Sequence, residues 1–338
     1  MPIRKSELYS SLWQSCDELR GGMDASQYKD YVLMLLFVKY VSDKYAGQKY
    51  GAIKVPEGSS FADMVRLKGK SDIGDKINKE VVGPLATENS LVDVPDFNDA
   101  TKLGSGKEMV DRLTNLIAIF ESPALDFSKN RAGGDDILGD AYEYLMRHFA
   151  TDSGKAKGQF YTPSEVSRLM AKLLGIAEAE TTPQTSIYDP TCGTGGFLTD
   201  AMNHVSEYGS SGKIPPVLVP HGQELEPETH AVCVAGMLIR RLESDPGRDL
   251  SKNIRQGSTL SNDQFAGERF HYCLSNPPFG KKWEKDKKAV ESEHEKGELG
   301  RFGPGLPKIS DGSMLFLMHL ASKLELPDNG GGRAAIVL

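Results

Sequence analysis

Residues 189–198 read DPTCGTGGFL, and they lie between a short β-rich run at residues 186–189 and an amphipathic helical pattern. Gly193, Gly195 and Gly196 allow the backbone to turn sharply and to approach a ligand closely. In a doubly wound sheet such a turn lies at the carboxyl end of a strand, where ligands usually bind. The stretch predicts a nucleotide-like cofactor site, although a tight strand-to-helix connection without a ligand can show the same glycines.

The spacing of these glycines disfavours a dinucleotide cofactor. A dinucleotide-binding turn needs a small residue three positions after its second glycine, where the helix packs closely against the strand. Counted from Gly193, that position is Leu198. A second motif is therefore needed to identify the cofactor.

Short β-rich runs alternate with amphipathic helical patterns on both sides of the turn. We expect three strands, one at residues 186–189, a second that ends near Glu224, and a third at 270–275. We expect helices at residues 162–174, after residue 196, and at 227–242. In the first of these helices the residues expected to face inward are Val166, Leu169, Met170, Leu173 and Leu174. The alternation indicates βαβ units, hence an α/β, Rossmann-like domain with a mostly parallel sheet.

The motif Asn276-Pro277-Pro278-Phe279 directly follows the run at 270–275. Its prolines fix φ and remove two backbone donors, which leaves carbonyl oxygens and the Asn276 amide as rigidly aimed hydrogen-bonding groups. Acceptors that bind both N–H bonds of a planar exocyclic amine favour a more nucleophilic nitrogen, and Phe279 could stack on the ring. A Pro-Pro turn with a core phenylalanine is the alternative, but the glycine-rich turn on the same sheet edge favours a catalytic site.

Upstream of residue 150 the periodic segments are helical. Asp24 and Gln27 form a plausible capping pair before a helix at residues 25–45, and apolar residues share one face over 109–120 and again over 137–149. Residues 51–105 have weak periodicity and receive no assignment. The polar, glycine-punctuated segment 151–158 has the composition of a connection. We predict a helical domain over residues 1–150 and the α/β domain over 151–338.

The 338 residues and their composition, 39% hydrophobic and 26% charged, are typical of a globular protein of two domains. No signal peptide is evident at the N-terminus, and the most apolar stretch, residues 31–38, is too short to cross a membrane, so we expect a cytoplasmic protein. The dispersed cysteines predict reduced, buried thiols and neither a disulfide framework nor a metal site; they are Cys16, Cys192, Cys233 and Cys273.

The two motifs resemble the cofactor and catalytic motifs of S-adenosylmethionine-dependent amino-methyltransferases, and residues 158–163, GQFYTP, resemble the additional cofactor-side motif that precedes them. Together with the helical N-terminal region, nearly the whole chain resembles the modification subunit of type I restriction-modification systems. The resemblance implies methyl transfer from S-adenosylmethionine to the N6 of adenine in double-stranded DNA. It also implies a separate specificity subunit and a restriction subunit in the full complex.

The resemblance assigns roles to individual residues. The catalytic set is Asn276, Pro277, Pro278 and Phe279. The cofactor-binding set is Gln159, Phe160, Tyr161, Thr162, Asp189, Thr191, Gly193, Thr194, Gly195, Gly196, Glu224 and Ser258. Glu224 ends the second predicted strand, where an acid can accept both ribose hydroxyls, although a surface glutamate is the alternative. At Ser258 the family often has an acid beside the adenine ring.

The formal net charge of −7 argues against tight DNA binding by this chain alone, because affinity for phosphates comes from Lys and Arg. Either a locally basic face or a partner subunit that supplies most of the DNA contact would reconcile the acidic charge with DNA binding, and we favour the partner subunit. The lysine-rich run 281–288 fits either a phosphate contact or a solvated face, and the glycine-rich run 297–305 either a lid or a surface loop.

Two further functions stay open, a protein-glutamine N5 methyltransferase, whose substrate amide offers the same N–H geometry, and an inactive scaffolding form. The terminal run 333–338 predicts a buried strand, which suggests truncation.

Overall fold

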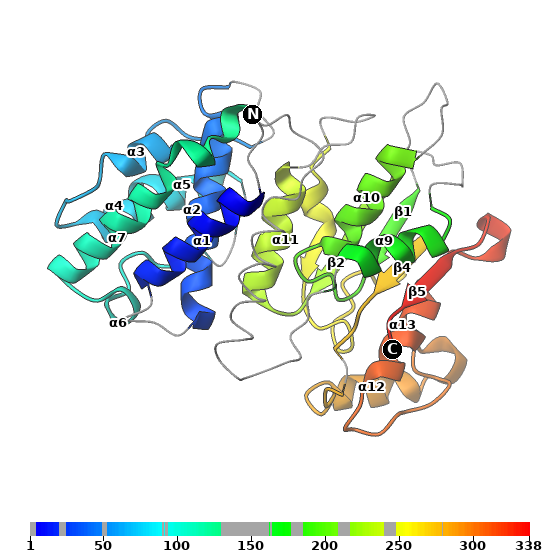
Figure 1. The fold of residues 1–338 in the computed structure, drawn as a ribbon. Coiled ribbons are helices and arrows are strands. Elements are labelled where there is room, and N and C mark those ends of the chain that lie inside the picture. Colours follow the sequence, from blue (N-terminus) through cyan, green and yellow to red (C-terminus); the bar gives the residue numbers. More distant parts are fainter. Residues whose placement is uncertain are drawn as a thin grey trace. The chain divides into compact units, whose positions relative to one another are not determined.

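The computed structural model describes residues 5–19, 25–48, 53–89, 91, 94–129, 162, 164–176, 185–208, 217–239, 248–278 and 280–338. The chain divides into two compact units, Met1–Lys155 and Ala156–Leu338 (Figure 1). The predicted connection at residues 151–158 and the helical face at 137–149 lie outside the described residues. Each unit is presented by itself below.

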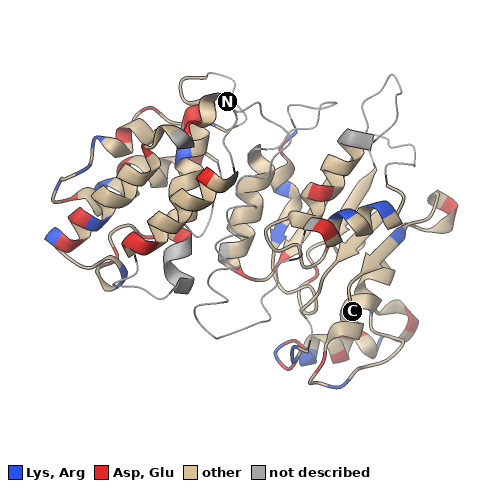
Figure 2. Cartoon of the chain, viewed as in Figure 1, with Lys and Arg blue, Asp and Glu red and all other residues tan. Residues whose placement is uncertain are grey.

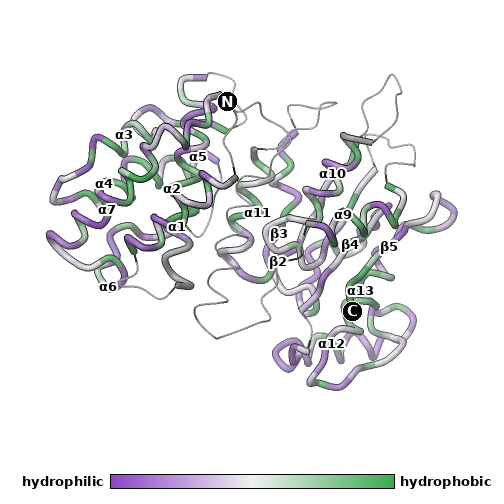
Figure 3. Tube along the Cα trace, in the orientation of Figure 1, coloured by the Kyte–Doolittle hydropathy of each residue, from purple (hydrophilic) through white to green (hydrophobic). Residues whose placement is uncertain are grey.

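The first unit is helical. Its three long helices are α1 (Lys5–Leu19), α2 (Ala25–Tyr45) and α7 (Lys107–Phe120), and α1 packs against the other two. These bounds confirm the helices predicted at 25–45 and 109–120, while the Asp24 and Gln27 side chains are outside the described part. Polar and apolar stretches alternate along α7 (Figure 3), whose buried residues are Met109, Leu113, Leu116, Ile117 and Phe120.

Residues 31–38 of α2 are all buried in this unit, which explains the long apolar run. The Tyr31 ring packs edge-on against Phe97, 5.2 Å between centroids, and its hydroxyl donates to the Asp96 carbonyl at 2.9 Å. No helix in the described ranges is both long and apolar enough to cross a membrane. The run is therefore a core helix, as the sequence predicts.

Residues 53–105, which received no assignment, contain several short helices. They are α3 (Phe61–Val65), α4 (Ile73–Lys76), the π-helix η1 (Ile77–Val82), α5 (Gly83–Glu88) and α6 (Ala100–Leu103). Ser60 and Asp63 cap α3 reciprocally in a capping box. After α7 come two 3-10 turns, η2 (Pro123–Leu125) and η3 (Phe127–Lys129). α3 and α6 are too short to show helical periodicity, whereas α4, η1 and α5 follow one another without a gap and the π-helical part interrupts the regular 3.6-residue repeat.

The second unit is built on a five-stranded sheet in the order β3-β2-β1-β4-β5, and every pairing is parallel. The strands are β1 (Ser186–Asp189), β2 (Val219–Glu224), β3 (Ile254–Gln256), β4 (Tyr272–Ser275) and β5 (Arg333–Ile336). The parallel sheet confirms the predicted α/β fold. The chain leaves β1 toward β2 and β3 on one side, and β4 and β5 lie on the other, so the junction of β1 and β4 is the topological switch point.

Helices cover this sheet (Figure 1). They are α9 (Ser164–Leu173), α10 (Gly196–Tyr208), α11 (Pro227–Ile239), α12 (Lys287–His294) and α13 (Ser313–Lys323), with 3-10 turns η4 (Leu250–Asn253), η5 (Gly297–Leu299) and η6 (Pro327–Asn329). α10 packs on β1 and β2, α11 on β2 and β3, and α13 on β5. At the sheet centre Tyr188 stacks on Phe270, 4.5 Å between ring centroids, and Phe265 packs edge-on against both.

The burial predicted for α9 is confirmed for Met170 and Leu174, but it is wrong for Leu169 and Leu173, which are 56% and 73% exposed. Ser167 and Ala171 are buried in their place, on a helix that packs against α10. The buried face is therefore turned away from the one that the leucines suggest.

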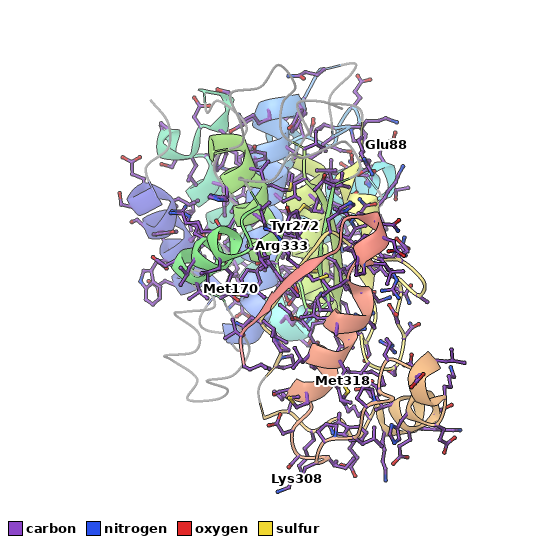
Figure 4. All side chains as sticks on the ribbon, turned by 90° about the vertical axis from the view of Figure 1, so that its right-hand side faces the viewer. Glu88, Met170, Tyr272, Lys308, Met318 and Arg333 are labelled. Carbon is purple, nitrogen blue, oxygen red and sulfur yellow. The ribbon has the colours of Figure 1, made fainter. Side chains whose placement is uncertain are left out.

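The burial predicted for the terminal strand is also wrong. β5 lies at the edge of the sheet, and Arg333 and Ala334 are exposed, because β4 covers one side of the strand only. In Figure 4, Arg333 on β5 lies beside Tyr272 of β4, with which it is in register.

Candidate active site at the carboxyl ends of β1, β2 and β4

Three chain segments meet at one edge of the sheet. The glycine-rich turn follows β1, Glu224 ends β2 and Asn276 follows β4. β1 pairs with both β2 and β4, so the turn lies between the other two segments. A hydroxyl contact joins two of them directly, since Thr191 Oγ1 and Ser275 Oγ lie 3.0 Å apart. Residues some 80 positions apart in the chain thus share one site, as expected for parallel strands.

The glycines of the turn serve different purposes. Gly193 has φ 55° and Gly195 has φ 88°, a left-handed region that disfavours other residues. A Cβ on Gly195 would approach Cys233 Sγ to 2.9 Å, whereas a Cβ on Gly193 would meet nothing within 4 Å. Gly195 therefore permits packing against α11, while Gly193 borders open space where a ligand can approach the backbone.

Behind the turn lies a pair of buried thiols. Cys192 Sγ and Cys233 Sγ are 3.9 Å apart, and neither forms a disulfide. The contact with Cys233 and burial both raise the pKa of Cys192. The two side chains pack between the turn and α11. All four cysteines of the chain are buried, and none of them is in a disulfide.

Asp189 is 1% exposed at the end of β1. Its Oδ1 accepts the Thr191 backbone N–H at 2.9 Å, and its Oδ2 has no hydrogen-bond partner among the described residues. Burial raises the pKa of Asp189 to about 8. A cationic ligand group beside Oδ2 would supply the missing partner and favour the ionised carboxylate.

Glu224 closes the other side of the turn. Its Oε2 accepts the Gly193 N–H and its Oε1 the Glu226 N–H, both at 2.9 Å. Burial is the main cause that raises its pKa. Each carboxylate oxygen has a second acceptor site left, so the group can also accept a pair of hydroxyls. Its two backbone bonds hold it rigidly at the rim of the turn.

Asn276 has one satisfied and one unsatisfied side-chain atom. Its Nδ2 donates to Thr162 Oγ1 at 2.9 Å. Its Oδ1 is buried and lacks a partner within the part of the chain that the structure describes. An unpaired buried acceptor is unfavourable unless a ligand completes it. Pro277 is buried and Pro278 half-buried beside it, and neither competes for that ligand with a backbone N–H.

Ser258 contacts an acid that sequence analysis did not include. Its Oγ donates to Asp286 Oδ1 at 2.7 Å, and the Ser261 hydroxyl donates to the same atom. The adjoining Gly257 N–H donates to the Glu224 carbonyl at 2.8 Å, so this segment lies beside the end of β2. Asp286 is 28 positions from Ser258 in sequence, and no local pattern could reveal the contact.

The other predicted residues fall into two groups. Thr194 and Gly196 lie in the turn and at the start of α10, and both are half-buried. Gln159, Phe160, Tyr161 and Phe279 lie outside the described residues. The contact between Thr162 and Asn276 was missed as well, because Thr162 was assigned to the cofactor side alone.

These residues fit an adenosyl cofactor with a cationic amino-acid end. Asp189 Oδ2 is a buried acceptor without a partner, Glu224 can accept two hydroxyls, and the backbone beside Gly193 is open. Asn276 Oδ1 adds an acceptor for a substrate N–H. The arrangement can therefore place a cationic cofactor next to an amine.

The sequence matches two family models. The N-6 DNA Methylase model covers residues 133–338, and the HsdM N-terminal domain model covers residues 8–120. Among curated relatives, the type I restriction enzyme MpnII methylase subunit of Mycoplasma pneumoniae is 24% identical over 94% of this chain and 65% of its own length. The EcoKI methylase subunit of Escherichia coli is 28% identical over 82% of this chain and 51% of its own. The chain thus spans about half to two thirds of these relatives.

Solved structures of type I modification subunits resemble this chain as well. The methyltransferase subunit of a type I restriction-modification system from Streptococcus thermophilus superposes with a TM-score of 0.70 at 26% identity, over 98% of this chain and 74% of that one. A modification subunit of a putative type I restriction enzyme from Vibrio vulnificus shares the fold, with a TM-score of 0.61, 20% identity, and 99% and 72% coverage. The predicted resemblance is confirmed: because the N-6 DNA Methylase model spans more than half of the sequence, the chain is an HsdM-like member of that family.

Proposed function

We propose that this chain transfers a methyl group from S-adenosylmethionine to the N6 of adenine in double-stranded DNA, as a type I modification subunit. The observation that carries the proposal is the pair of unpartnered buried acceptors, Asp189 Oδ2 and Asn276 Oδ1, at the ends of adjacent strands. One acceptor suits the cationic end of the cofactor and the other the substrate amine.

On the cofactor side, bound S-adenosylmethionine supplies an electrophilic methyl group on a sulfonium. Asp189 binds the cationic amino-acid end, Glu224 accepts the ribose hydroxyls, and the backbone at Gly193, Thr194, Gly195 and Gly196 lies against the ligand. Thr191 holds Asp189 in place through its backbone N–H. The proposal extends this side to Gln159, Phe160, Tyr161 and Thr162, of which Thr162 is described.

Ser258 and Asp286 act together beside the adenine ring of the cofactor. Related enzymes often place an acid beside the adenine ring at the position of Ser258, and here the Ser258 hydroxyl holds the Asp286 carboxylate. We propose that Asp286 takes the part of that acid and accepts from the exocyclic amine of the cofactor. The residue comes from a different segment, but its carboxylate oxygen lies 2.7 Å from the Ser258 hydroxyl, which supports the proposal.

On the substrate side, Asn276 Oδ1 and the Pro277 carbonyl accept the two N–H bonds of the target amine. This draws the nitrogen lone pair out of the ring and makes it more nucleophilic. The amine nitrogen would take the methyl group that the bound cofactor supplies, and it would release one proton to solvent, because amide oxygens are too weakly basic to keep it. Phe279 stacks on the base, which must be flipped out of the duplex.

The proposed partners rest on the net charge and on the family to which the chain belongs. With a net charge of −7, the chain depends on a specificity subunit for much of its DNA contact, and a restriction subunit completes the complex in the cytoplasm. Residues 151–338 form the catalytic domain in this proposal, and residues 1–150 the helical domain.

The test measures transfer of labelled methyl to duplex DNA, with and without the specificity subunit, followed by mass spectrometry of the nucleosides. We expect N6-methyladenine when the partner is present. Asn276→Ala should abolish transfer while cofactor binding persists, and Asn115→Ala, which removes a surface hydrogen bond to Glu18, should change neither. Methylated glutamine in place of adenine, or cofactor binding without any turnover, would contradict the proposal.

A further inference from the structure

A group of exposed lysines lies next to the candidate active site in sequence. Lys281, Lys282, Lys285 and Lys288 are exposed, as is Lys308 on the neighbouring segment. These five residues are called the lysine cluster below. Lys287 is left out because it pairs with Glu291 at 3.6 Å. Figure 2 shows blue segments of the ribbon beside α12, and Figure 4 shows Lys308 projecting from the edge of the unit.

The segment that carries the cluster is anchored. Trp283 is 3% exposed and packs with Val290, Phe302 and Leu315. Its indole N–H donates to the Lys308 carbonyl at 2.9 Å, and its backbone N–H to the Ile309 carbonyl at 3.2 Å. These bonds place Lys308 beside the 281–288 run and fix the backbone from which the lysines project.

The remaining residues of the run divide according to their contacts. Asp286 is half-buried and accepts the hydroxyls of Ser258 and Ser261. Glu284 is exposed. Within the described ranges no ion pair involves a member of the lysine cluster, in contrast to the paired Lys287. The lysine cluster thus offers exposed positive charges close in sequence to the Asn276 motif, in a chain whose net charge is −7.

The cluster also lies within reach of the site. Lys281 is three residues after Pro278, so their Cα atoms are at most about 11 Å apart. A base whose amine reaches Asn276 remains covalently joined to its sugar and to the phosphates on either side. Those phosphates must therefore lie near the chain that leaves the motif, which here carries lysines.

We propose that the lysine cluster binds the backbone phosphates that flank the target base. The proposal rests on the proposed function and deepens it, since it assigns a DNA-contacting surface to this acidic chain. Lysine acts on phosphate as a point charge and reads no sequence, so the cluster contributes to the strength of binding and leaves sequence recognition to the partner. It also decides between the two interpretations of the 281–288 run.

The experiment measures the affinity of the full chain for a labelled duplex between 50 and 200 mM salt. Each phosphate contact adds about 0.9 to the slope of log K against log salt. The variant Lys281→Gln/Lys282→Gln/Lys285→Gln/Lys288→Gln should lower that slope by about 2 to 4 and weaken binding most at low salt. The corresponding Lys→Arg variant should bind as the unmodified chain does.

The matched control removes the same charge elsewhere. Lys54, Lys76, Lys79 and Lys102 each pair with an acid on the first unit, and their exchange for Gln should leave the slope within about one contact of the original value. Equal effects of both variants would mean that net charge alone matters and would overturn the proposal. So would an unchanged slope in the cluster variant, or no duplex binding by the unmodified chain at 50 mM salt.

Methyl transfer by the same proteins separates the two proposals. If the unmodified chain methylates DNA with its partner while the cluster variant keeps the original salt slope, the lysine inference fails and the proposed function stands. If the slope falls as expected while no variant methylates adenine, the surface binds phosphate and the proposed function fails.

Discussion

The Asn276 amide is held at its nitrogen and unsatisfied at its oxygen. Thr162 Oγ1 accepts from Nδ2, which turns Oδ1 toward the position where a substrate N–H is expected. Without this bond the amide could rotate by half a turn and present its donor instead. We therefore expect Thr162 to position Asn276 for the proposed reaction, in addition to any contact with the cofactor.

Thr162→Val should lower kcat by about 10- to 100-fold, because the change removes an acceptor worth about 1 to 3 kcal/mol to a buried N–H group. Thr162→Ser keeps the hydroxyl and should restore most of the rate. The measurement is the steady-state kinetics of methyl transfer with cofactor affinity determined separately. An unaltered kcat in the valine variant, or loss of cofactor affinity alone, would refute the positioning role.

Asp189 predicts a dependence of stability on pH. Burial raises its pKa from 3.8 to about 8, so between these values the unfolded chain loses a proton that the native chain keeps. The contribution of this carboxyl to stability is full below the lower pKa, falls as pH rises through the window and is level above the upper one.

Asp189→Asn does not titrate, so the difference in unfolding free energy between the variant and the unmodified chain should move in favour of the variant from about pH 5 to about pH 9. We expect a change on the order of a few kcal/mol. Chemical denaturation of the ligand-free proteins at several pH values measures it. Parallel stability curves would show that the native carboxyl ionises normally.

The sequence predicts the position of a site residue best where that residue directly follows a strand. Asp189, Glu224 and Asn276 were placed at one sheet edge because parallel strands bring their carboxyl ends together, and the structure has them there. The contacts of Thr162 with Asn276 and of Asp286 with Ser258 join segments 114 and 28 positions apart. Side-chain pairing over such separations leaves no pattern in a single sequence.

Among the elements, α12 and the glycine-rich segment after it are joined by a charged side chain. Arg301 forms an ion pair with Glu293 of α12 and donates to the carbonyls of Thr259 and Leu260. It also donates to His319 Nδ1 at 2.8 Å, and His319 Nε2 lies 3.1 Å from the Tyr188 hydroxyl of β1. Burial lowers the pKa of His319, and the nearby Arg301 and Lys323 lower it further. The neutral imidazole can then accept from Arg301.

Arg301→Met should destabilise the second unit by about 2 to 4 kcal/mol, because it leaves Glu293 and two carbonyls without their donor. Lys287→Met on the same helix removes an exposed pair and should change stability by less than about 0.5 kcal/mol. Urea denaturation compares the two. Equal, small effects would mean that solvent replaces the Arg301 contacts.

Glycines in the 297–305 run have a packing function that composition does not reveal. A Cβ on Gly300 would meet the Glu293 carbonyl oxygen at 1.9 Å, and Phe302 is fully buried. The run was expected to be either a lid or a surface loop; Gly300, Arg301 and Phe302 anchor it to α12, whereas Leu299 is 93% exposed. The alternation of strands and helices was predictable because periodicity reports it, whereas which face of α9 or β5 is buried depends on neighbours.

The molecule as a whole consists of two units, each with its own buried residues. A cofactor that binds one native unit stabilises that unit. In calorimetry we therefore expect two transitions and an upward shift of only one when S-adenosylmethionine is added.

Core variants assign the transitions. Leu113→Ala in α7 should lower the first-unit transition and Leu320→Ala in α13 the other, each by the equivalent of about 2 to 5 kcal/mol. A single transition that both variants and the cofactor move together would show that the units unfold as one. The division into a helical and an α/β part follows from periodicity, but no such pattern reports their coupling.

The buried cysteines can report where and how fast the structure opens locally. Cys16 lies in α1 of the first unit, whereas Cys192 and Cys233 lie behind the glycine-rich turn and Cys273 in β4. An alkylating reagent can reach each sulfur only when its surroundings open, so the order in which the four acquire a mass tag records the order in which the structure opens. Because Cys192 and Cys233 lie behind the turn, a ligand held there should slow their alkylation more than that of Cys16.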